Sequence, residues 1–171
     1  MKVIIPMSGQ SSRFTSAGYE TPKHLIEIDG KKVIEHIIDL YPKDSEFVFI
    51  INDKHKEETD IVKVLKKLVD DAVIITVPSH KKGPVHSVLK ASKYIEDDEP
   101  VVINYCDFSM DWDYNDFEEF VEQTECDGCV VCYTGFHPHM LGGDNYAFCK
   151  TEENKIVEIR EKQPFTADKM S

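Results

Sequence analysis

Small residues and an arginine stand directly after an apolar run near the start of the chain. The run at residues 3–7 leads into Ser8-Gly9-Gln10-Ser11-Ser12, and Arg13 follows. Small side chains let successive backbone N–H groups approach a phosphate closely, and a guanidinium can pair with the same group. A Ser/Gly turn after a strand is as often only a turn, so the stretch is a candidate phosphate loop.

Two more charged groups could act at a phosphoryl centre. Lys23 follows Pro22, whose ring restricts the backbone, and an ammonium placed there could neutralise phosphate charge. Asp107 comes directly after the apolar run 101–105, and a carboxylate there can hold Mg²⁺ together with water and substrate phosphates. The plainer interpretation of Lys23 is a solvated lysine. The plainer interpretation of the acidic residues is a helix cap, and we expect Asp113 to be that cap.

Alternating apolar segments are expected to position these groups. Continuous runs typical of buried strands occur at residues 3–7, 47–51, 72–77 and 101–105. Apolar residues at helical spacing lie between them, at 33–41, 61–68 and 85–95. The alternation predicts an α/β fold with a mostly parallel sheet covered on both faces. Ligands of such sheets lie beyond the carboxyl ends of the strands, so we expect the three loops to converge there.

The pattern changes after Asp111. A helix with Phe117, Phe120 and Val121 inside is followed by strand candidates at residues 129–133, 146–149 and 156–159. The polar turn 152–155 predicts a hairpin between the last two, and we expect antiparallel strands at one edge of the sheet. No repeat or low-complexity linker interrupts the chain, which predicts a single domain over residues 1–171.

Composition narrows the class of protein. Lys and Arg total 20 against 32 Asp and Glu, a net charge of −12, which argues against nucleic acid and anionic membranes as partners. No apolar run approaches the length of a membrane span, and the first residues lack a secretory signal, so we expect a cytoplasmic protein.

The cysteines are odd in number and expected to be reduced. Cys126, Cys129 and Cys132 suggest a zinc site, but an offset of three within a strand turns the last two thiols to opposite faces, which favours core thiols.

The order of these motifs resembles the sugar-phosphate nucleotidyltransferase family. Residues 5–14 and 22–31 are similar to the family's glycine-rich loop with its arginine, its Pro-Lys pair and the Gly-Lys that follows. Residues 81–87 resemble the loop on the nucleobase side, and Asp107 matches the metal aspartate. Glu161-Lys162 falls where the family carries residues that touch the acceptor. The resemblance implies a Rossmann-like, GT-A-like three-layer sandwich with an antiparallel edge.

The resemblance also implies a reaction. A nucleoside monophosphate would move from CTP, UTP or dTTP to a phosphate monoester such as a sugar phosphate, releasing pyrophosphate, for surface polysaccharide or capsule precursors. A cytidylyltransferase of phosphocholine or phosphoglutamine is the alternative. Arg13 would contact the pyrophosphate, Lys23 the α-phosphate, Asp107 the Mg²⁺, and Glu161 and Lys162 the acceptor. The remaining nucleotide-binding residues would be Met7, Ser8, Gly9, Gln10, Ser11, Ser12 and Gly83.

Departures from the family pattern leave other interpretations open. No glutamine precedes Gly83 where relatives use one to read a pyrimidine, so the base is open, as is a homo-oligomer. The chain ends before a second metal aspartate, which suggests a domain truncated at its C-terminus. One rival is a metal-dependent glycosyltransferase, because Asp111-Trp112-Asp113 is an Asp-x-Asp motif. The other rival is a non-catalytic nucleotide-binding subunit.

Overall fold

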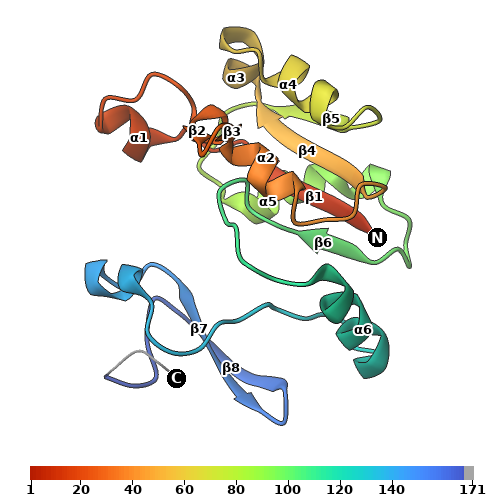
Figure 1. Cartoon of the computed structure of the whole chain (residues 1–171), viewed down its shortest axis with the longest axis vertical. Helices are drawn as coiled ribbons and strands as arrows, with labels where there is room; N and C mark the ends of the chain where they lie inside the picture. Colours follow the sequence, from red (N-terminus) through yellow and green to blue (C-terminus); the bar gives the residue numbers. More distant parts are fainter. Residues whose placement is uncertain (168–171) are drawn as a thin grey trace. The chain divides into compact units, whose positions relative to one another are not determined.

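The computed structural model describes residues 1–167, which form two compact units divided after Glu118. The first unit is built on four parallel strands in the order β5-β4-β1-β6 (Figure 1). Met7 pairs with Ile51, and Asn52 pairs with Val77, so the carboxyl ends of the neighbouring strands lie together. The strands are β1 (Lys2–Met7), β4 (Glu46–Asn52), β5 (Val73–Val77) and β6 (Val101–Ile103).

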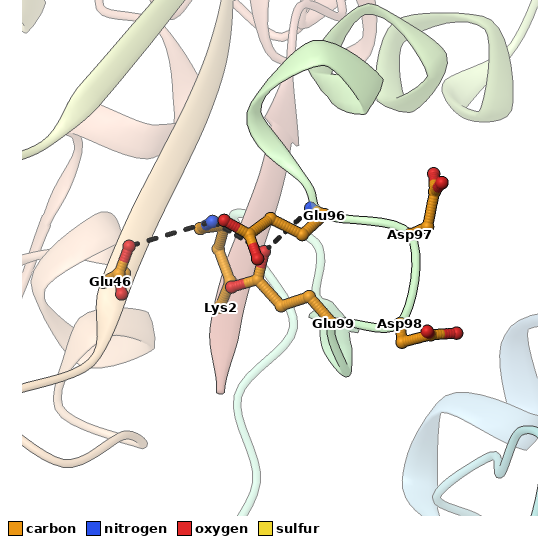
Figure 2. A pocket seen from close by; sticks show the side chains of 6 residues that line it. All are labelled: Lys2, Glu46, Glu96, Asp97, Asp98 and Glu99. Atoms are coloured by element: carbon orange, nitrogen blue, oxygen red, sulfur yellow. Dashed lines mark hydrogen bonds and ion pairs between the residues drawn. The ribbon is translucent and has the colours of Figure 1, made fainter.

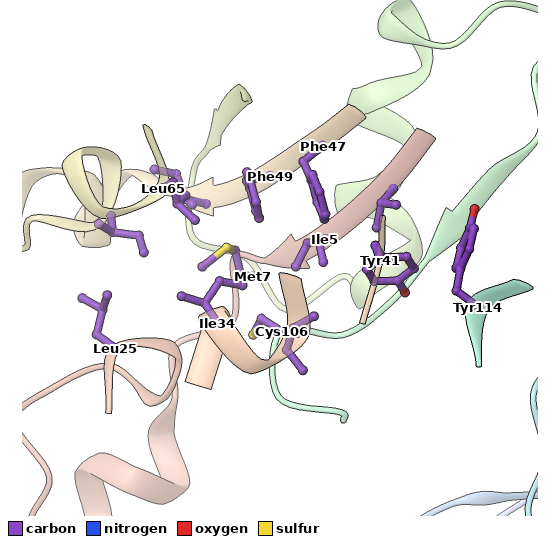
Figure 3. Close-up of a cluster of buried hydrophobic side chains, with 14 residues drawn as sticks. Ile5, Met7, Leu25, Ile34, Tyr41, Phe47, Phe49, Leu65, Cys106 and Tyr114 are labelled. Atoms are coloured by element: carbon purple, nitrogen blue, oxygen red, sulfur yellow. The ribbon is translucent and has the colours of Figure 1, made fainter. Parts of the chain in front are cut away.

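Helices cover both faces of this sheet, as the buried strand pattern requires. On one face, Val3, Ile5 and Met7 pack with Phe47 and Phe49 against α2 (Val33–Ile38) and α4 (Ile61–Leu68) (Figure 3). The opposite face packs against α5 (Pro84–Val88) and η2 (Leu89–Tyr94). Burial of these apolar faces, at about 25 cal/mol per Å² of apolar surface, drives the assembly. The first unit is therefore a three-layer arrangement.

Short elements fill the connections of the first unit. Helix α1 (Ser12–Ser16) follows β1, and η1 (Lys23–Leu25) precedes the hairpin of β2 (Glu27–Ile28) and β3 (Lys31–Lys32). Helix α3 (Asp53–Glu58) begins directly after β4. Helix α6 (Tyr114–Thr124) begins in this unit, and Asp113 Oδ1 accepts a hydrogen bond from the Asn115 backbone at 2.8 Å, which confirms the predicted cap.

The second unit contains η3 (Pro138–Gly142) and the antiparallel hairpin of β7 (Ala147–Glu152) and β8 (Lys155–Glu161). The predicted hairpin is confirmed. Glu153 and Asn154 have φ of 50° and 63°, the two left-handed residues that a tight hairpin turn of the right twist needs.

Several expectations about elements are wrong. Residues 129–133 form no strand and are exposed, because apolar residues make a strand only where another strand supplies hydrogen bonds. Cys129 and Cys132 are accordingly exposed rather than core thiols. Val85 and Leu89 were expected inside, but their helix turns them to solvent, where they are 69% and 63% exposed. Phe120 is also exposed, at 38%.

The α/β class and the mostly parallel sheet are confirmed. Within the described residues the antiparallel strands form two small sheets of their own, β2-β3 and β7-β8, and do not extend the edge of the parallel sheet. No helix in the described part of the chain is both long enough and apolar enough to cross a membrane.

Candidate functional site

The candidate phosphate loop leaves the buried end of β1. Met7 is 2% exposed, and the chain turns at Ser11, whose φ of 52° and ψ of 29° place it in the left-handed region just before α1. A side chain at Gly9 would find no atom within 4 Å, and Gly9 does not have a left-handed φ. The fold itself therefore does not require glycine at position 9. The open space above its backbone is where a phosphate could approach closely.

Asn52, which the sequence analysis did not select, holds this loop in place. It is the last residue of β4 and is 1% exposed. Its Nδ2 donates to the carbonyl oxygens of Ser8 and Gly9 at 3.1 and 3.4 Å, while its Oδ1 accepts from the His55 backbone at 2.6 Å. One side chain thus caps α3 and fixes the carbonyls of the phosphate loop. A polar residue directly after a buried strand was the signal that could have identified it.

Lys23 and Asp107 meet at the carboxyl end of the sheet. The Lys23 ammonium lies 2.7 Å from Asp107 Oδ2, and the side chains are 24% and 39% exposed. Lys23 begins η1, and Asp107 follows β6, on the side of β1 opposite to β4 and β5. The strand order reverses direction at β1, which is where open α/β sheets bind ligands. The two residues selected from sequence are therefore in direct contact at the expected place.

A second short lysine–carboxylate pair lies at the opposite end of β1. Lys2 Nζ is 2.8 Å from Glu99 Oε2, 2.7 Å from the Tyr94 carbonyl and 3.8 Å from Glu46 (Figure 2). Its hydrogen bond to Glu99 raises the pKa of Lys2 and lowers that of Glu99. This ammonium is 12% exposed and fully engaged in joining three segments of the fold. It provides a structural reference for the Lys23–Asp107 pair.

The donor set at Asp107 suits Mg²⁺ held jointly with a substrate. No group of three or more metal-binding side chains occurs among the side chains that the structure describes, so these side chains form no all-protein cage. Mg²⁺ is commonly held by one or two carboxylates together with phosphates and water, and Asp107 offers one partly exposed carboxylate. The neighbouring Cys106 thiol is 1% exposed, and burial raises its pKa to about 12.

A pocket of about 430 Å³ opens beside the Lys23–Asp107 pair. His36, on α2, borders it and is tied to the Ile28 carbonyl at 2.9 Å. A largely apolar pocket with a charged pair at its wall can bind a ligand that has an anionic group and a less polar remainder. The lining residues are Phe14, Lys23, Ile26, Ile28, Asp29, Val33, His36, Ile37, Asp107 and Ser109.

The other predicted site residues fall in separate places. Arg13 is exposed on α1 and forms no ion pair with any described residue. Gly83 immediately precedes α5 with φ of 84°, a conformation that favours glycine. Glu161 and Lys162 belong to the second unit, where their side chains lie 3.4 Å apart at the end of β8. Their role toward an acceptor stays a prediction.

Two histidines are buried, although histidine is a polar side chain that is seldom fully buried. His24 and His55 are 1% and 7% exposed, and their rings meet edge to face with centroids 5.0 Å apart. His24 Nε2 and His55 Nδ1 have no hydrogen-bond partner in the described part of the chain. Burial, together with the nearby His55 and Lys23, lowers the pKa of His24 to about 3. A neutral pair therefore underlies the loop that carries Lys23.

The Asp-x-Asp motif is used for structure. Asp113 caps α6, and Trp112 donates from Nε1 to the Leu40 carbonyl at 3.1 Å while its ring packs on Tyr41 and Tyr114. With one carboxylate engaged by a helix terminus and the central residue anchored in the core, the motif does not form a metal site. The geometry thus argues against the glycosyltransferase rival.

A candidate phosphate loop and a lysine–carboxylate pair lie at the switch point of a parallel sheet, which is where open α/β domains bind nucleotides. A family model described as "MobA-like NTP transferase domain" matches residues 3–161. The bifunctional protein GlmU of Buchnera aphidicola is 24% identical over 165 residues, 95% of this chain and 33% of the relative. The "Probable molybdenum cofactor guanylyltransferase" of Bacillus cereus is 31% identical over 166 residues, 94% of this chain and 74% of the relative.

Solved structures share the fold of this chain. The nucleoside-diphosphate-sugar pyrophosphorylase from Vibrio cholerae RC9 is similar with a TM-score of 0.74 and 25% identity, over 96% of this chain and 68% of that one. The inositol-1-phosphate CTP transferase from T. maritima shares the fold with a TM-score of 0.67 and 15% identity, over 98% of this chain and 66% of that one.

The chain belongs to the MobA-like NTP transferase domain family, because that match spans nearly all of its length. The predicted nucleotidyltransferase resemblance is therefore confirmed at the level of the family. The chain spans about a third of the GlmU relative from Buchnera aphidicola, so the activity of a whole protein remains a matter for proposal.

Proposed function

We propose that this domain transfers a nucleoside monophosphate from a nucleoside triphosphate to a phosphate-monoester acceptor and releases pyrophosphate. The observation that supports this proposal best is the 2.7 Å contact between Lys23 and Asp107 at the carboxyl end of the sheet, beyond β1 and its phosphate loop. Family membership supports the same class of reaction. The contact provides one cation and one carboxylate where the α-phosphate and a divalent cation would lie.

The reaction needs alignment and charge stabilisation rather than a protein nucleophile. An anionic oxygen of the acceptor forms a bond to the α-phosphorus while the bond to the β-phosphate oxygen breaks, so that pyrophosphate leaves. The Lys23 ammonium would neutralise charge that develops on the α-phosphate, and backbone N–H groups of residues 8–12 would hold the β- and γ-phosphates. Arg13, exposed and not engaged in an ion pair within residues 1–167, would contact the leaving pyrophosphate.

Asp107 is the residue that would hold Mg²⁺ in this site. The ion, when bound with the triphosphate, supplies charge neutralisation at the phosphate oxygens. With Asp107 holding the cation, the Lys23 ammonium would be free to pair with the α-phosphate. The same lysine would thereby balance the carboxylate in the free protein and the phosphate in the complex.

The substrates are proposed at the level of chemical class. The structural likeness to a nucleoside-diphosphate-sugar pyrophosphorylase supports a sugar phosphate as acceptor, with Glu161 and Lys162 as the residues that contact it. Precursor synthesis for surface polysaccharides or capsules is the setting this would imply. A cytidylyl transfer to phosphocholine or another non-sugar phosphate is the alternative to test, and the nucleoside could be cytidine, uridine or deoxythymidine.

Release of pyrophosphate tests the proposal directly. The protein is incubated with Mg²⁺, each nucleoside triphosphate and either glucose 1-phosphate or phosphocholine. We expect release with one nucleotide, reduced about 10²–10³-fold in Asp107→Asn and Lys23→Met, the loss typical for removing a group that stabilises transition-state charge. Glu99→Gln, in the structural pair of Figure 2, is the matched control and should retain activity within about twofold.

The other outcomes discriminate between the rivals. Equal activity in Asp107→Asn and the unaltered protein would refute the assigned site. Binding of a triphosphate without release of pyrophosphate in the presence of either acceptor would favour the non-catalytic nucleotide-binding subunit. Release that occurs with phosphocholine and not with glucose 1-phosphate would select the cytidylyltransferase alternative.

A further inference from the structure

One chain of hydrogen bonds joins the phosphate loop to the loop after β5. Ser8 Oγ lies 2.7 Å from Ser87 Oγ, and Ser87 Oγ lies 3.0 Å from Nε2 of His80. Ser8 follows β1 and His80 follows β5, while Ser87 lies on α5 and is bonded to both. Ser87 is 0% exposed, so its hydroxyl must satisfy its hydrogen bonds within the protein. The buried serine therefore couples the two loops.

The second ring nitrogen of His80 sets the direction of these hydrogen bonds. The backbone N–H of Lys82 donates to His80 Nδ1 at 3.2 Å. A neutral imidazole that accepts at Nδ1 carries its proton on Nε2, so His80 donates to Ser87 Oγ. The Ser87 hydroxyl is buried and needs an acceptor, and Ser8 Oγ at 2.7 Å can supply it. In that arrangement the Ser8 proton is free to point toward a ligand.

Other contacts hold the same two loops together. Gln10 Nε2 donates to Ser79 Oγ at 2.6 Å, which is a second link between the loops after β1 and β5. The His86 ring packs edge to face on the His80 ring with centroids 4.8 Å apart, and so restricts its orientation. The residues around Gly83 are those that the family resemblance places on the nucleobase side. The base-side loop and the phosphate loop are thus one connected structure.

We propose that His80 is a positioning residue, which acts through Ser87 to direct the hydroxyl of Ser8 toward the phosphates of a nucleoside triphosphate. This inference rests on the proposed function and adds a residue that neither phosphate chemistry nor the motif would select. It has a specific consequence. Because the effect of His80 reaches the phosphates through Ser8, its loss weakens the binding of a ligand that has no nucleobase at all.

Two substitutions of His80 separate its hydrogen bonds. In His80→Gln the side-chain amide nitrogen can replace Nε2 and still donate to Ser87. In His80→Asn the shorter amide can replace Nδ1 and accept from Lys82, but it cannot reach Ser87. Ser87→Ala removes the central hydroxyl. Its matched control is Ser92→Ala, which removes an exposed hydroxyl that donates to the Leu89 carbonyl at 3.0 Å on the adjoining helical segment.

The first readout needs no ligand. Amide hydrogen exchange at residues 8–10, followed by NMR on the whole chain, reports the order of the phosphate loop. We expect faster exchange there in His80→Asn and Ser87→Ala, and unaltered exchange in His80→Gln and Ser92→Ala. Thermal unfolding of each variant shows whether it is folded. Equal exchange in all four variants would overturn the coupling between the loops.

The second readout compares two probes, inorganic tripolyphosphate and the nucleoside triphosphate that the protein uses, each with Mg²⁺. We expect His80→Asn and Ser87→Ala to weaken both probes about tenfold, the effect of one lost hydrogen bond, and His80→Gln to restore binding. Weakening of the nucleotide alone would overturn the proposal and make His80 a base contact. If exchange is faster in His80→Asn and Ser87→Ala but the unaltered protein binds no triphosphate, the coupling between the loops stands and the proposed function is overturned.

Discussion

The ammonium of Lys23 lies 2.7 Å from the carboxylate of Asp107, and both groups are partly open to solvent. If Asp107 holds a divalent cation, as proposed, the ion and the Lys23 ammonium would compete for the same carboxylate, because both bind its oxygen atoms.

This competition predicts opposite effects of one substitution. Lys23→Met should increase the affinity of the nucleotide-free protein for Mn²⁺, a spectroscopic substitute for Mg²⁺, by about two- to fivefold, since a lost surface ion pair is worth ~1 kcal/mol or less. The same variant should lose turnover about 10²-fold or more. Electron paramagnetic resonance of bound Mn²⁺ measures the first effect. Unaltered Mn²⁺ affinity in Lys23→Met would show that the ion pair does not oppose the metal.

Asn52 should contribute separately to stability and to binding. Asn52→Ala removes both the cap of α3 and the two hydrogen bonds to the phosphate loop, so we expect a loss of about 1–2 kcal/mol in the free energy of unfolding. Asn52→Ser can keep the cap but lacks the reach to Ser8 and Gly9. It should cost less stability and still weaken triphosphate binding about tenfold.

Urea unfolding and titration with the nucleoside triphosphate measure the two effects of Asn52. Thr59, whose hydroxyl donates to the His55 carbonyl at 2.6 Å near the other end of α3, offers the control Thr59→Ser. It should leave triphosphate binding intact. Full binding by Asn52→Ser would mean that the loop does not depend on these hydrogen bonds.

The parallel sheet could be predicted from sequence because its strands are buried on both faces. Residues 3–7 and 47–51 are continuous apolar runs, and only a strand in a covered sheet needs that pattern over so short a length. Residues 129–133 carry a similar pattern, yet they form no strand. Hydrophobicity shows that a segment can pair, whereas pairing itself depends on which neighbouring strand the fold supplies.

The site could be predicted only where position along the chain determines position in the fold. Lys23 and Asp107 were identified because loops at the carboxyl ends of parallel strands converge. Asn52 obeys the same rule and could have been included. The role of Ser87 could not be predicted, because no local feature of a helix shows that one of its serines contacts a distant loop. The burial of His24 could not be predicted either, because local polarity does not reveal tertiary burial.

Two glycines should respond differently to alanine. At Gly9 the φ is not left-handed and no atom lies within 4 Å of an added methyl group, so Gly9→Ala should leave stability unaltered or raise it by up to about 1 kcal/mol. The methyl group would nevertheless occupy space needed by a phosphate. Gly83 has φ of 84°, so Gly83→Ala should cost about 1 kcal/mol or more.

Thermal unfolding and triphosphate binding distinguish the two alanine variants. We expect Gly9→Ala to be as stable as the unaltered protein and to bind the triphosphate at least tenfold more weakly. The main effect of Gly83→Ala should be a loss of stability. A Gly9→Ala protein that binds normally would show that no phosphate approaches the backbone at that position.

The buried pair His24 and His55 predicts how stability depends on pH. His24 titrates near pH 6.5 when unfolded, and burial, with His55 and Lys23 nearby, lowers its pKa in the folded protein to about 3. Between these values the unfolded state binds more protons, so acid favours unfolding. The stability is complete above pH 6.5 and is lost progressively as the pH falls toward 3. At pH 5 the loss from His24 is about 2 kcal/mol, at about 1.4 kcal/mol per pH unit.

Urea unfolding at pH 7.5 and at pH 5 measures this loss, and His24→Leu should remove most of it. Burial also lowers the pKa of His55, so a smaller dependence remains in that variant. The pKa values of Glu27 and Glu99 are also lowered in the folded protein, from an ordinary value of 4.5. These carboxylates therefore change the stability mainly below pH 5, whereas the histidines change it above pH 5. His36→Leu, at a histidine that is not fully buried, is the control and should retain the full dependence. An undiminished loss of stability at pH 5 in His24→Leu would place the acid-sensitive group elsewhere.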